Sequence, residues 1–288
     1  MVYIGIDLGG TKIIVASADK SGKIIKQVRH KTPIDLNEGL ELLKKLIREV
    51  SSGQKIEGIG CACGGPLDYK TGIVSPLHQP EWRNVPLKKI MEKEFRCKFF
   101  VDVDTNIAAL AEAKIGTGKN YKNFVYITIS TGMGGGIIVD GKLYRGKSHP
   151  EIAHQTGNWS LKNHHKNFDI ENHYCECGVK DCLEGIVSGN SIRKIYGKSA
   201  EEINDPKILE EIGYNLGQGL RNIAVLHSPE AIVLGGGVAV GLGEKILCPA
   251  RKVVQQSLKI VPVPEILISR LGNDAPLLGA LILTRERK

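Results

Sequence analysis

Val2–Leu8 (VYIGIDL), followed by Gly9-Gly10-Thr11, indicates how this chain begins to fold. A short run of apolar and β-branched residues that ends in glycines predicts a strand and then a tight turn. Lys12 to Ala18 is typical of a second strand and Ile24 to Arg29 of a third, with a turn at Ser21–Lys23 between them. We therefore expect the chain to begin with three consecutive strands, the first two joined by a glycine-rich turn.

The same order of elements recurs in the second half of the chain. Asn123 to Ser130 is again apolar and β-branched, and Thr131–Gly136 (TGMGGG) predicts a second glycine-rich turn. Ile137–Val139 and Lys142–Tyr144 are typical of two further strands, with a hairpin turn at Asp140-Gly141. An internal duplication of one supersecondary unit is the economical explanation.

Helical and strand patterns fill the rest of the chain. Leu36 to Val50 carries an apolar stripe at helical spacing, Pro206 begins a second helical pattern, and Ala275 to Arg285 predicts a closing helix. Glu230–Leu234 and Glu265–Ser269 predict short strands. The sequence therefore predicts an α/β protein with two similar lobes.

The composition favours a folded protein in a reducing compartment. With 288 residues, 42% of them hydrophobic and 24% charged, the chain can build a sizeable core, which excludes wholesale disorder. No uncharged apolar stretch reaches the roughly 18–20 residues that span a bilayer, and Met1 to Asp7 lacks the basic region of a secretion signal. An odd number of cysteines, seven, favours metal binding or free thiols over a disulfide framework. We expect a cytoplasmic protein without a membrane partner.

The net charge of +8 has several interpretations. Lysines and arginines are scattered in ones and twos, and aromatic residues make up only 5% of the chain, too few for an obvious base-stacking platform. We therefore favour a solvated basic surface over a nucleic-acid partner, with a small anionic ligand such as a nucleotide as the second interpretation.

Three glycine clusters follow predicted strands, at Asp7–Lys12, Ser130–Gly136 and Gly235–Gly237. Glycine after a strand lets the backbone approach a ligand and directs N–H groups at phosphate oxygens. One such turn is more often only a tight turn, but three in one chain favour phosphate binding. The one G-x-x-x-x-G-K-[ST] match, Gly141–Ser148 (GKLYRGKS), runs through a predicted strand and does not join a strand to a helix, and no G-x-G-x-x-G begins a helix with an acid downstream, so neither a Walker nor a Rossmann site fits.

Cysteines gather in one short segment. Three thiolates at spacings of two and five, Cys175, Cys177 and Cys182, together with one imidazole would make a closed tetrahedral zinc site. Three free cysteines in a loop are the weaker alternative, because Gly178 and its polar neighbours suit a metal knuckle. The residues alone leave the histidine open among His154, His164, His165 and His173. The remaining cysteines are expected to be buried free thiols: Cys61, Cys63, Cys97 and Cys248.

A candidate reaction centre lies at Asp102–Asn106. This segment ends the apolar run Phe99–Val101 and precedes a helical pattern from Ala108 to Lys114. An acid at a strand end, before a helix, lies where α/β proteins place ligands. The alternative is that Asp102 or Asp104 only caps the helix.

Together these motifs resemble the actin–hexokinase–Hsp70 ATPase superfamily. Gly5–Lys12 resembles its first phosphate motif, Ser130–Gly136 its second, and Glu230–Ala239 its adenosine motif. Cys175–Glu184 and Glu151–His154 are close to the C-x-C-G-x-x-G-C-x-E and E-x-G-H patterns of the ROK family of repressors, open reading frames and kinases. The chain is similar to this family over essentially its whole length.

The resemblance implies a two-lobed ribonuclease H-like (actin-like ATPase) fold, with duplicated βββαβα units and a cleft between the lobes. The N-terminal lobe would span residues 1–115 and be completed by the C-terminal helix 275–288, and the C-terminal lobe would span 116–274. A homodimer is implied by the resemblance alone.

The resemblance also implies ATP-dependent phosphorylation of a hexose in carbohydrate metabolism such as glycolysis. The enzyme would transfer the γ-phosphate to a sugar hydroxyl, expected to be the 6-hydroxyl, with Mg²⁺ bound to ATP and a structural Zn²⁺. Asp104 matches the family's general base, a role that typically contributes about 10²–10⁴-fold. A fructokinase, an N-acetylhexosamine kinase and a non-catalytic sugar-sensing regulator are the alternatives. Family regulators carry a helix-turn-helix domain before the first phosphate motif, for which a strand beginning at Val2 leaves no room.

The family's other functional residues carry over by position. The residues expected to bind ATP phosphates are Asp7, Gly9, Gly10, Thr11, Lys12, Thr131, Gly132, Gly134, Gly235, Gly236 and Gly237, with Asp7 also holding Mg²⁺ through water. The residues expected to contact the sugar are Gly65, His78, Asp104, Glu151, His154 and Glu184. The zinc ligands would be His154, Cys175, Cys177 and Cys182.

Departures from the family pattern bear on the choice of sugar. Val103 stands where the family usually has an asparagine before the base, and His78 stands where many members have another. Those asparagines normally contact sugar hydroxyls, while His149–Glu151 and Cys182–Gly185 resemble the fructokinase branch. The hexose therefore stays open among glucose, fructose, mannose and N-acetylated hexoses. The stretch between His154 and Cys175 is longer than usual for the family, which implies a loop insertion.

Overall fold

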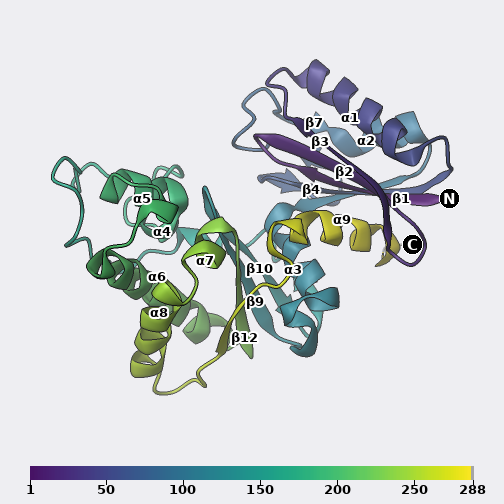
Figure 1. Cartoon of the computed structure of the whole chain (residues 1–288). Coiled ribbons are helices and arrows are strands. Elements are labelled where there is room, and N and C mark those ends of the chain that lie inside the picture. Colours follow the sequence, from purple (N-terminus) through teal and green to yellow (C-terminus); the bar gives the residue numbers. More distant parts are fainter. Residues whose placement is uncertain (287–288) are drawn as a thin grey trace. The chain divides into compact units, whose positions relative to one another are not determined.

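The computed structural model describes residues 1–286, and contacts between residues divide the chain into two compact units (Figure 1). Unit 1 contains Met1–Glu112, Arg145–His149 and the chain from Asp274 onward, and unit 2 contains Ala113–Tyr144 and Pro150–Asn273. The last two positions of the predicted C-terminal segment 275–288 lie outside the described residues. The short segment Arg145–His149 belongs to unit 1, although unit 2 precedes and follows it.

Unit 1 is built on a five-stranded sheet with the order β3-β2-β1-β4-β8. Its strands are β1 (Val2–Leu8), β2 (Lys12–Ala18), β3 (Ile24–Lys31), β4 (Ile56–Cys63) and β8 (Lys98–Val103). The three strands predicted at the start of the chain are present and are antiparallel neighbours, and β4 and β8 run parallel to β1. A small sheet lies outside this one, made of β5 (Leu67–Asp68), β6 (Ile73–Val74) and β7 (Val85–Pro86).

Helices cover both faces of the unit 1 sheet (Figure 1). The helices are α1 (Leu36–Ser51), α2 (Leu87–Phe95), α3 (Asp104–Ile115) and α9 (Ala275–Glu286). One core joins α1 and α2 to the apolar side chains of β1 and β4, and smaller clusters join α3 and α9 to the other face. Gly60 allows α9 to pack directly on the sheet, because a Cβ there would lie 2.0 Å from the Ala280 carbonyl oxygen.

Unit 2 repeats the sheet of unit 1, with the order β11-β10-β9-β12-β13. Its strands are β9 (Phe124–Ile129), β10 (Met133–Val139), β11 (Lys142–Tyr144), β12 (Ala231–Gly235) and β13 (Glu265–Ile268). Again the first three are antiparallel and the last two are parallel to the first. The internal duplication inferred from sequence is therefore present in the two sheets.

The helices of unit 2 share one large apolar core with this sheet. They are α4 (Glu184–Val187), α5 (Gly189–Tyr196), α6 (Pro206–His227), α7 (Gly237–Leu242) and α8 (Glu244–Ser257), with 3₁₀ turns η1 (Thr117–Asn120), η2 (Ile152–His154), η3 (Ala200–Glu202) and η4 (Gly272–Asp274). The Asp205 carboxylate caps α6 by accepting a hydrogen bond from Lys207 N, and Pro206 occupies the first turn, where its missing N–H costs nothing.

Two details differ from the sequence expectations. The turn predicted over Thr131–Gly136 is shorter, because β10 already begins at Met133. Gly135 belongs to this strand for a packing reason: a Cβ there would lie 2.2 Å from Ile152 Cδ1. The helix expected from Ala108 begins earlier, at Asp104.

The four remaining cysteines do not share one environment. Cys61 and Cys63 are buried as expected, and burial raises the pKa of both thiols. Cys97 is half-buried, whereas Cys248 is exposed on α8, so the prediction that it is buried was wrong. The apolar neighbours of Cys248 in sequence misled that prediction, since a helix turns successive side chains in different directions.

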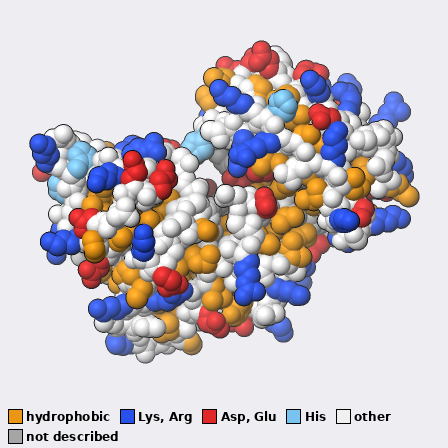
Figure 2. Space-filling model, in the orientation of Figure 1, with side chains coloured by type: hydrophobic (Ala, Val, Ile, Leu, Met, Phe, Trp, Pro, Cys, Tyr) orange, Lys and Arg blue, Asp and Glu red, His pale blue; other side chains and the backbone are white. Residues whose placement is uncertain are grey.

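No helix within residues 1–286 combines the length and the apolar character needed to cross a bilayer. On the face shown in Figure 2, Lys and Arg side chains are dispersed and Asp and Glu side chains lie among them.

Candidate functional site

Three predicted motifs of unit 1 directly follow strands whose carboxyl ends lie side by side in the sheet. The parallel registers pair Leu8 with Cys63 and Cys63 with Val103, so β1, β4 and β8 end side by side. The segments that follow these strands are the first glycine turn, the Gly64-Gly65 loop and Asp104. The carboxyl ends of parallel strands are where α/β proteins bind ligands, so strand register alone gathers these residues.

The first glycine turn is held by hydrogen bonds to its neighbours. Gly9 N donates to Lys12 O at 3.0 Å, and Thr32 N donates to Thr11 O at 3.1 Å. The Thr32 hydroxyl donates to Gly9 O at 2.6 Å. Gly10 allows His78 to lie close to the turn, because a Cβ on Gly10 would be only 2.9 Å from His78 Cβ. His78, which the resemblance places among the residues expected to contact the sugar, lies against the first glycine turn in unit 1.

The loop that carries His78 also contacts the predicted sugar loop. Leu77 N donates to Gly65 O at 2.9 Å, and the peptide bond between Gly65 and Pro66 is cis. Arg83 Nη1 donates to the carbonyl oxygens of Pro76, at 2.7 Å, and of Gln79. One ordered loop therefore lies between the sugar loop and the first glycine turn.

Two carboxylates of unit 1 influence each other. Asp7, near the end of β1, is only 8% exposed. Burial, and next the neighbouring Asp104 carboxylate, raise the pKa of Asp7 to about 7, although Lys12 and Arg29 oppose the shift. Asp104 is the first residue of α3, and its Oδ1 accepts a hydrogen bond from Thr105 N at 2.7 Å. A pair of acids that resists double ionisation is a suitable partner for a divalent cation.

The second glycine turn lies in unit 2 between β9 and β10. Ser130 N donates to Gly132 O at 2.8 Å within the turn. Gly189 N donates to Ser130 O and Asn190 N to Thr131 O, which ties the turn to the start of α5. Of the predicted phosphate residues, Thr131 and Gly132 lie in this turn, while Gly134 lies inside β10.

The third glycine cluster connects β12 to α7. Gly235 ends the strand, where a Cβ would lie 2.5 Å from the Tyr126 hydroxyl. Gly236 has a φ of 86° and its Cβ would lie 2.4 Å from Ile129 O, so both its conformation and its surroundings require glycine. Gly237 begins α7, and its Cβ position has nothing within 4 Å.

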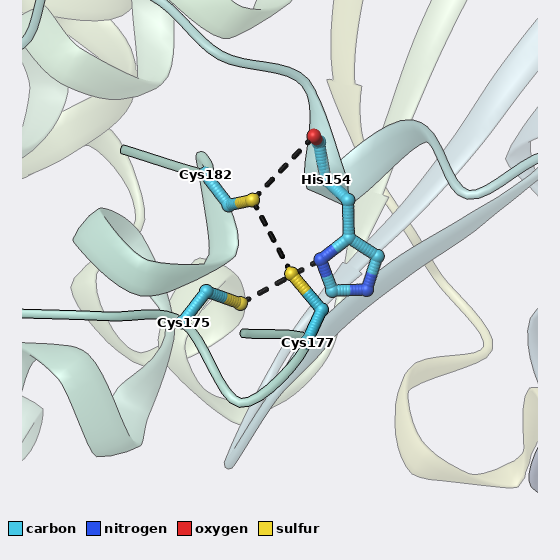
Figure 3. Close-up of side chains that lie close together, drawn as sticks. All are labelled: His154, Cys175, Cys177 and Cys182. Carbon is cyan, nitrogen blue, oxygen red and sulfur yellow. Dashed lines mark hydrogen bonds between the residues drawn. The ribbon is translucent and has the colours of Figure 1, made fainter. Parts of the chain in front are cut away.

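The predicted zinc ligands come together in unit 2 (Figure 3). One ligand atom from each of His154, Cys175, Cys177 and Cys182 lies within 4.8 Å of the others. Cys175 Sγ is 3.6 Å from His154 Nδ1, and Cys177 Sγ is 3.5 Å from Cys182 Sγ. Thiolates and an imidazole in a compact group of four suit Zn²⁺.

The other three candidate histidines are engaged elsewhere in unit 2. His164 Nδ1 contacts His165 O, His165 Nε2 contacts Lys194 O, and His173 Nε2 contacts Gly185 O. His154 is therefore the histidine that the fold brings to the cysteines, although the others are closer in sequence.

Glu184 connects the cysteine cluster to the second glycine turn. Its Oε1 accepts a hydrogen bond from Met133 N at 3.0 Å, and its Oε2 lies 3.5 Å from His154 Nδ1 and 3.4 Å from Cys175 Sγ. On the other side of the imidazole, the exposed Glu151 places an oxygen 3.9 Å from His154 Nε2. The predicted sugar residues of unit 2 thus surround one imidazole.

A cavity of about 730 Å³ in unit 2 is separate from these motifs. It lies between the 158–163 loop and helices α6 and α8, and no residue predicted for the site lines it. The buried Glu211 carboxylate fixes that loop by accepting hydrogen bonds from Lys162 N, at 2.8 Å, and from the Asn163 side chain. No short sequence motif predicted the contact between Glu211 and this loop.

Comparisons with known proteins identify the family of the chain. The ROK family model matches residues 3–287. The glucokinase of Streptomyces coelicolor is 29% identical over 318 residues, which cover 98% of this chain and 97% of that protein. The fructokinase of Zymomonas mobilis is 31% identical over 303 residues, covering 100% and 98%.

A solved structure extends the agreement to the fold. A ROK family glucokinase from Streptomyces griseus, in complex with glucose and AMPPNP, superposes with a TM-score of 0.79 at 28% identity, covering 99% of this chain and 100% of that chain. The predicted actin-like ATPase fold is thereby confirmed. The chain belongs to the ROK family.

Proposed function

We propose that this protein is an ATP-dependent sugar kinase that transfers the γ-phosphate of ATP to a hexose, with Asp104 as general base. Relatives that match nearly the whole chain are named as sugar kinases. The observation that carries the assignment of the base is the strand register of unit 1, which brings Asp104 to the same sheet edge as Asp7 and the first glycine turn.

In this mechanism the sugar hydroxyl, which we propose is the 6-hydroxyl, donates its proton to the Asp104 carboxylate. The hydroxyl oxygen forms a bond to the γ-phosphorus, and the bond from that phosphorus to the bridging oxygen of ADP breaks. The glycine turns are proposed to hold the phosphates through backbone N–H groups, because most of the acceleration in such transfers comes from alignment and charge stabilisation. Mg²⁺, when bound with ATP, would neutralise phosphate charge, and Asp7 would hold it through water.

The cysteine cluster is proposed to hold a structural zinc through His154 Nδ1 and the three thiolates. His154 Nε2 would then remain on the side of Glu151, free to contact a sugar hydroxyl. In this arrangement the metal orients the imidazole, and the carboxylates beside it accept hydrogen bonds from the sugar.

The choice of hexose stays open within this proposal. Relatives at similar identity are named glucokinase and fructokinase. Val103 and His78 replace asparagines of the family pattern, and a Cβ on Gly10 would lie 2.9 Å from His78 Cβ, which supports a link between this residue and the proposed phosphate turn. We expect these two residues to set the preference.

A coupled ADP-release assay with ATP, Mg²⁺ and glucose, fructose, mannose, N-acetylglucosamine and N-acetylmannosamine tests the proposal. We expect turnover on at least one sugar, a loss of about 10²–10⁴-fold in Asp104→Asn, and sugar affinity that calorimetry finds largely unchanged. Asp68→Asn, which changes an exposed carboxyl of the same unit, is the matched control. Normal turnover in Asp104→Asn would refute the base, and sugar binding without turnover in the wild type would favour a sensor.

We also propose a homodimer, which the family resemblance alone supports. Light scattering of the purified protein should give twice the chain mass of 31.4 kDa. A mass of one chain at micromolar concentration would refute it.

A further inference from the structure

A buried ion pair lies next to the proposed base. Arg145 Nε donates to Asp102 Oδ2 at 2.6 Å, and Asp102 is only 1% exposed. The Arg145 guanidinium also lies over the Tyr69 ring, with 4.6 Å between Cζ and the ring centroid. All three residues belong to unit 1.

The Asp102 carboxylate spans the junction between β8 and α3. Its Oδ1 accepts hydrogen bonds from Val103 N at 2.8 Å and from Asn106 Nδ2 at 2.9 Å. Asp104 lies between these two donors in the chain. One buried carboxylate therefore holds the backbone of Val103 before the proposed base and the side chain of Asn106 after it.

Arg145 comes from the one short segment of unit 1 that unit 2 flanks on both sides, Arg145–His149. Glu151, one of the proposed sugar residues, follows it two positions later. The ion pair thus anchors the chain leading to Glu151 to the strand end that carries Asp104.

Asp102 depends on this partner. A buried carboxylate that loses its cation keeps its desolvation cost, so removing one member of such a pair is strongly unfavourable. Lysine is a poor replacement, because the planar guanidinium both donates along a defined direction and stacks on a ring.

We propose that Arg145 is a positioning residue for the phosphoryl transfer: it acts through Asp102 to hold Asp104 in its reactive orientation. The catalytic part of this inference rests on the proposed function. The structural part, that Arg145 orders the β8–α3 junction, does not require it.

The test uses four variants. Arg145→Met and Arg145→Lys remove or alter the guanidinium, and Asp102→Asn/Arg145→Met removes both charges. Arg48→Met is the matched control, because Arg48 also pairs with a carboxylate, Glu94, and also lies near a ring of unit 1, but is 58% exposed. Steady-state kinetics are measured below the melting temperature of every variant, and hydrogen exchange is followed in peptides spanning 101–110.

We expect Arg145→Met to lower kcat roughly 10²-fold with KM values for sugar and ATP nearly unchanged, since small misplacements of a reacting group cost rate rather than affinity. Arg145→Lys should not rescue kcat. The double variant should regain thermal stability, because no unpaired charge stays buried, but not kcat. Exchange at residues 103–106 should be faster in all three variants and unchanged in Arg48→Met.

Two results would overturn the proposal. The first is a wild-type kcat per folded molecule in Arg145→Met, and the second is recovery of kcat in the double variant. Either result would mean that Arg145 only neutralises the charge of Asp102 and does not position Asp104. If the wild type phosphorylates no hexose, the proposed function fails separately, and hydrogen exchange still decides: unchanged exchange at the junction refutes the positioning role and faster exchange supports it.

Discussion

Asp7→Asn is expected to make the ligand-free protein more stable at alkaline pH while it abolishes activity. Asp7 is buried beside Asp104, and its pKa is raised to about 7 from the ordinary value of 3.8. At pH 8.5 the folded protein must therefore bury an anion that the unfolded chain exposes freely. Asparagine keeps the shape of the side chain and removes this cost, but it also removes the carboxylate proposed to hold Mg²⁺.

The sign and size follow from proton linkage. The folded pKa lies above the unfolded one, so the stabilisation is complete below about pH 4 and is lost as pH rises through 7. Each pH unit between the two values changes stability by about 1.4 kcal/mol. Between pH 5 and pH 8.5 the wild type should lose about 3 kcal/mol more than Asp7→Asn, because the titrating groups outside the coupled Asp7–Asp104 pair contribute equally to both proteins.

Urea unfolding at the two pH values measures this difference. The chain has two tryptophans: Trp82 is fully buried in unit 1, and Trp159 lies in unit 2. In a Trp159→Phe background, Trp82 fluorescence reports the unfolding of the unit that contains Asp7. Asp68→Asn is the control, since the pKa of that exposed carboxyl is lowered by hydrogen bonds, first of all from Lys70 N, and its loss should produce no alkaline gain. Parallel stability–pH curves for the wild type and Asp7→Asn would refute the reasoning.

Three further changes test the packing and the metal cluster. A chelator should lower the melting temperature of unit 2 in the wild type and in Cys248→Ser but not in Cys182→Ser, which should already melt lower; equal melting of all three would exclude a structural metal. Gln79→Leu should stabilise by about 1–2 kcal/mol in denaturant unfolding, because within residues 1–286 neither side-chain amide atom of the buried Gln79 has a hydrogen-bond partner; a loss of stability would show that this amide is satisfied. Gly279→Ala should destabilise by about 1–3 kcal/mol, since its Cβ would lie 2.0 Å from a carbonyl oxygen of α3, whereas Gly241→Ala has open space and should be nearly neutral; similar stabilities of the two variants would contradict the close helix packing.

The strands and the gathering of motifs in unit 1 follow from local patterns. Val2–Leu8 is a short apolar and β-branched run followed by turn glycines, a pattern that is typical of a strand. Neighbouring parallel strands bring their carboxyl ends to the same end of the sheet, whatever residues their loops contain. The glycines of β10 were harder to interpret. Gly134–Gly136 predicted a turn, but they lie in the strand, where Gly135 leaves room for Ile152, a residue distant in the chain.

Contacts between residues far apart in the sequence could not be predicted from local sequence patterns. Arg145 and Asp102 are 43 positions apart, and neither lies in a motif that demands the other. The cluster of His154 and three cysteines was different, because the spacing of its cysteines limits the geometry. The resemblance already implied His154, whereas the residues alone left it open, since it lies 21 positions from Cys175 and other histidines are closer in sequence.

Detection of the product by ³¹P nuclear magnetic resonance would show whether the protein transfers the γ-phosphate of ATP to a hexose. The purified protein is incubated with ATP, Mg²⁺ and each hexose, and the spectrum is followed for ADP and a sugar phosphate monoester. We predict equal amounts of the two products for at least one hexose, with the ester on the 6-hydroxyl, and neither product with Asp104→Asn at the same protein concentration. ADP without a sugar phosphate, or sugar phosphate formed at the wild-type rate by Asp104→Asn, would contradict the account.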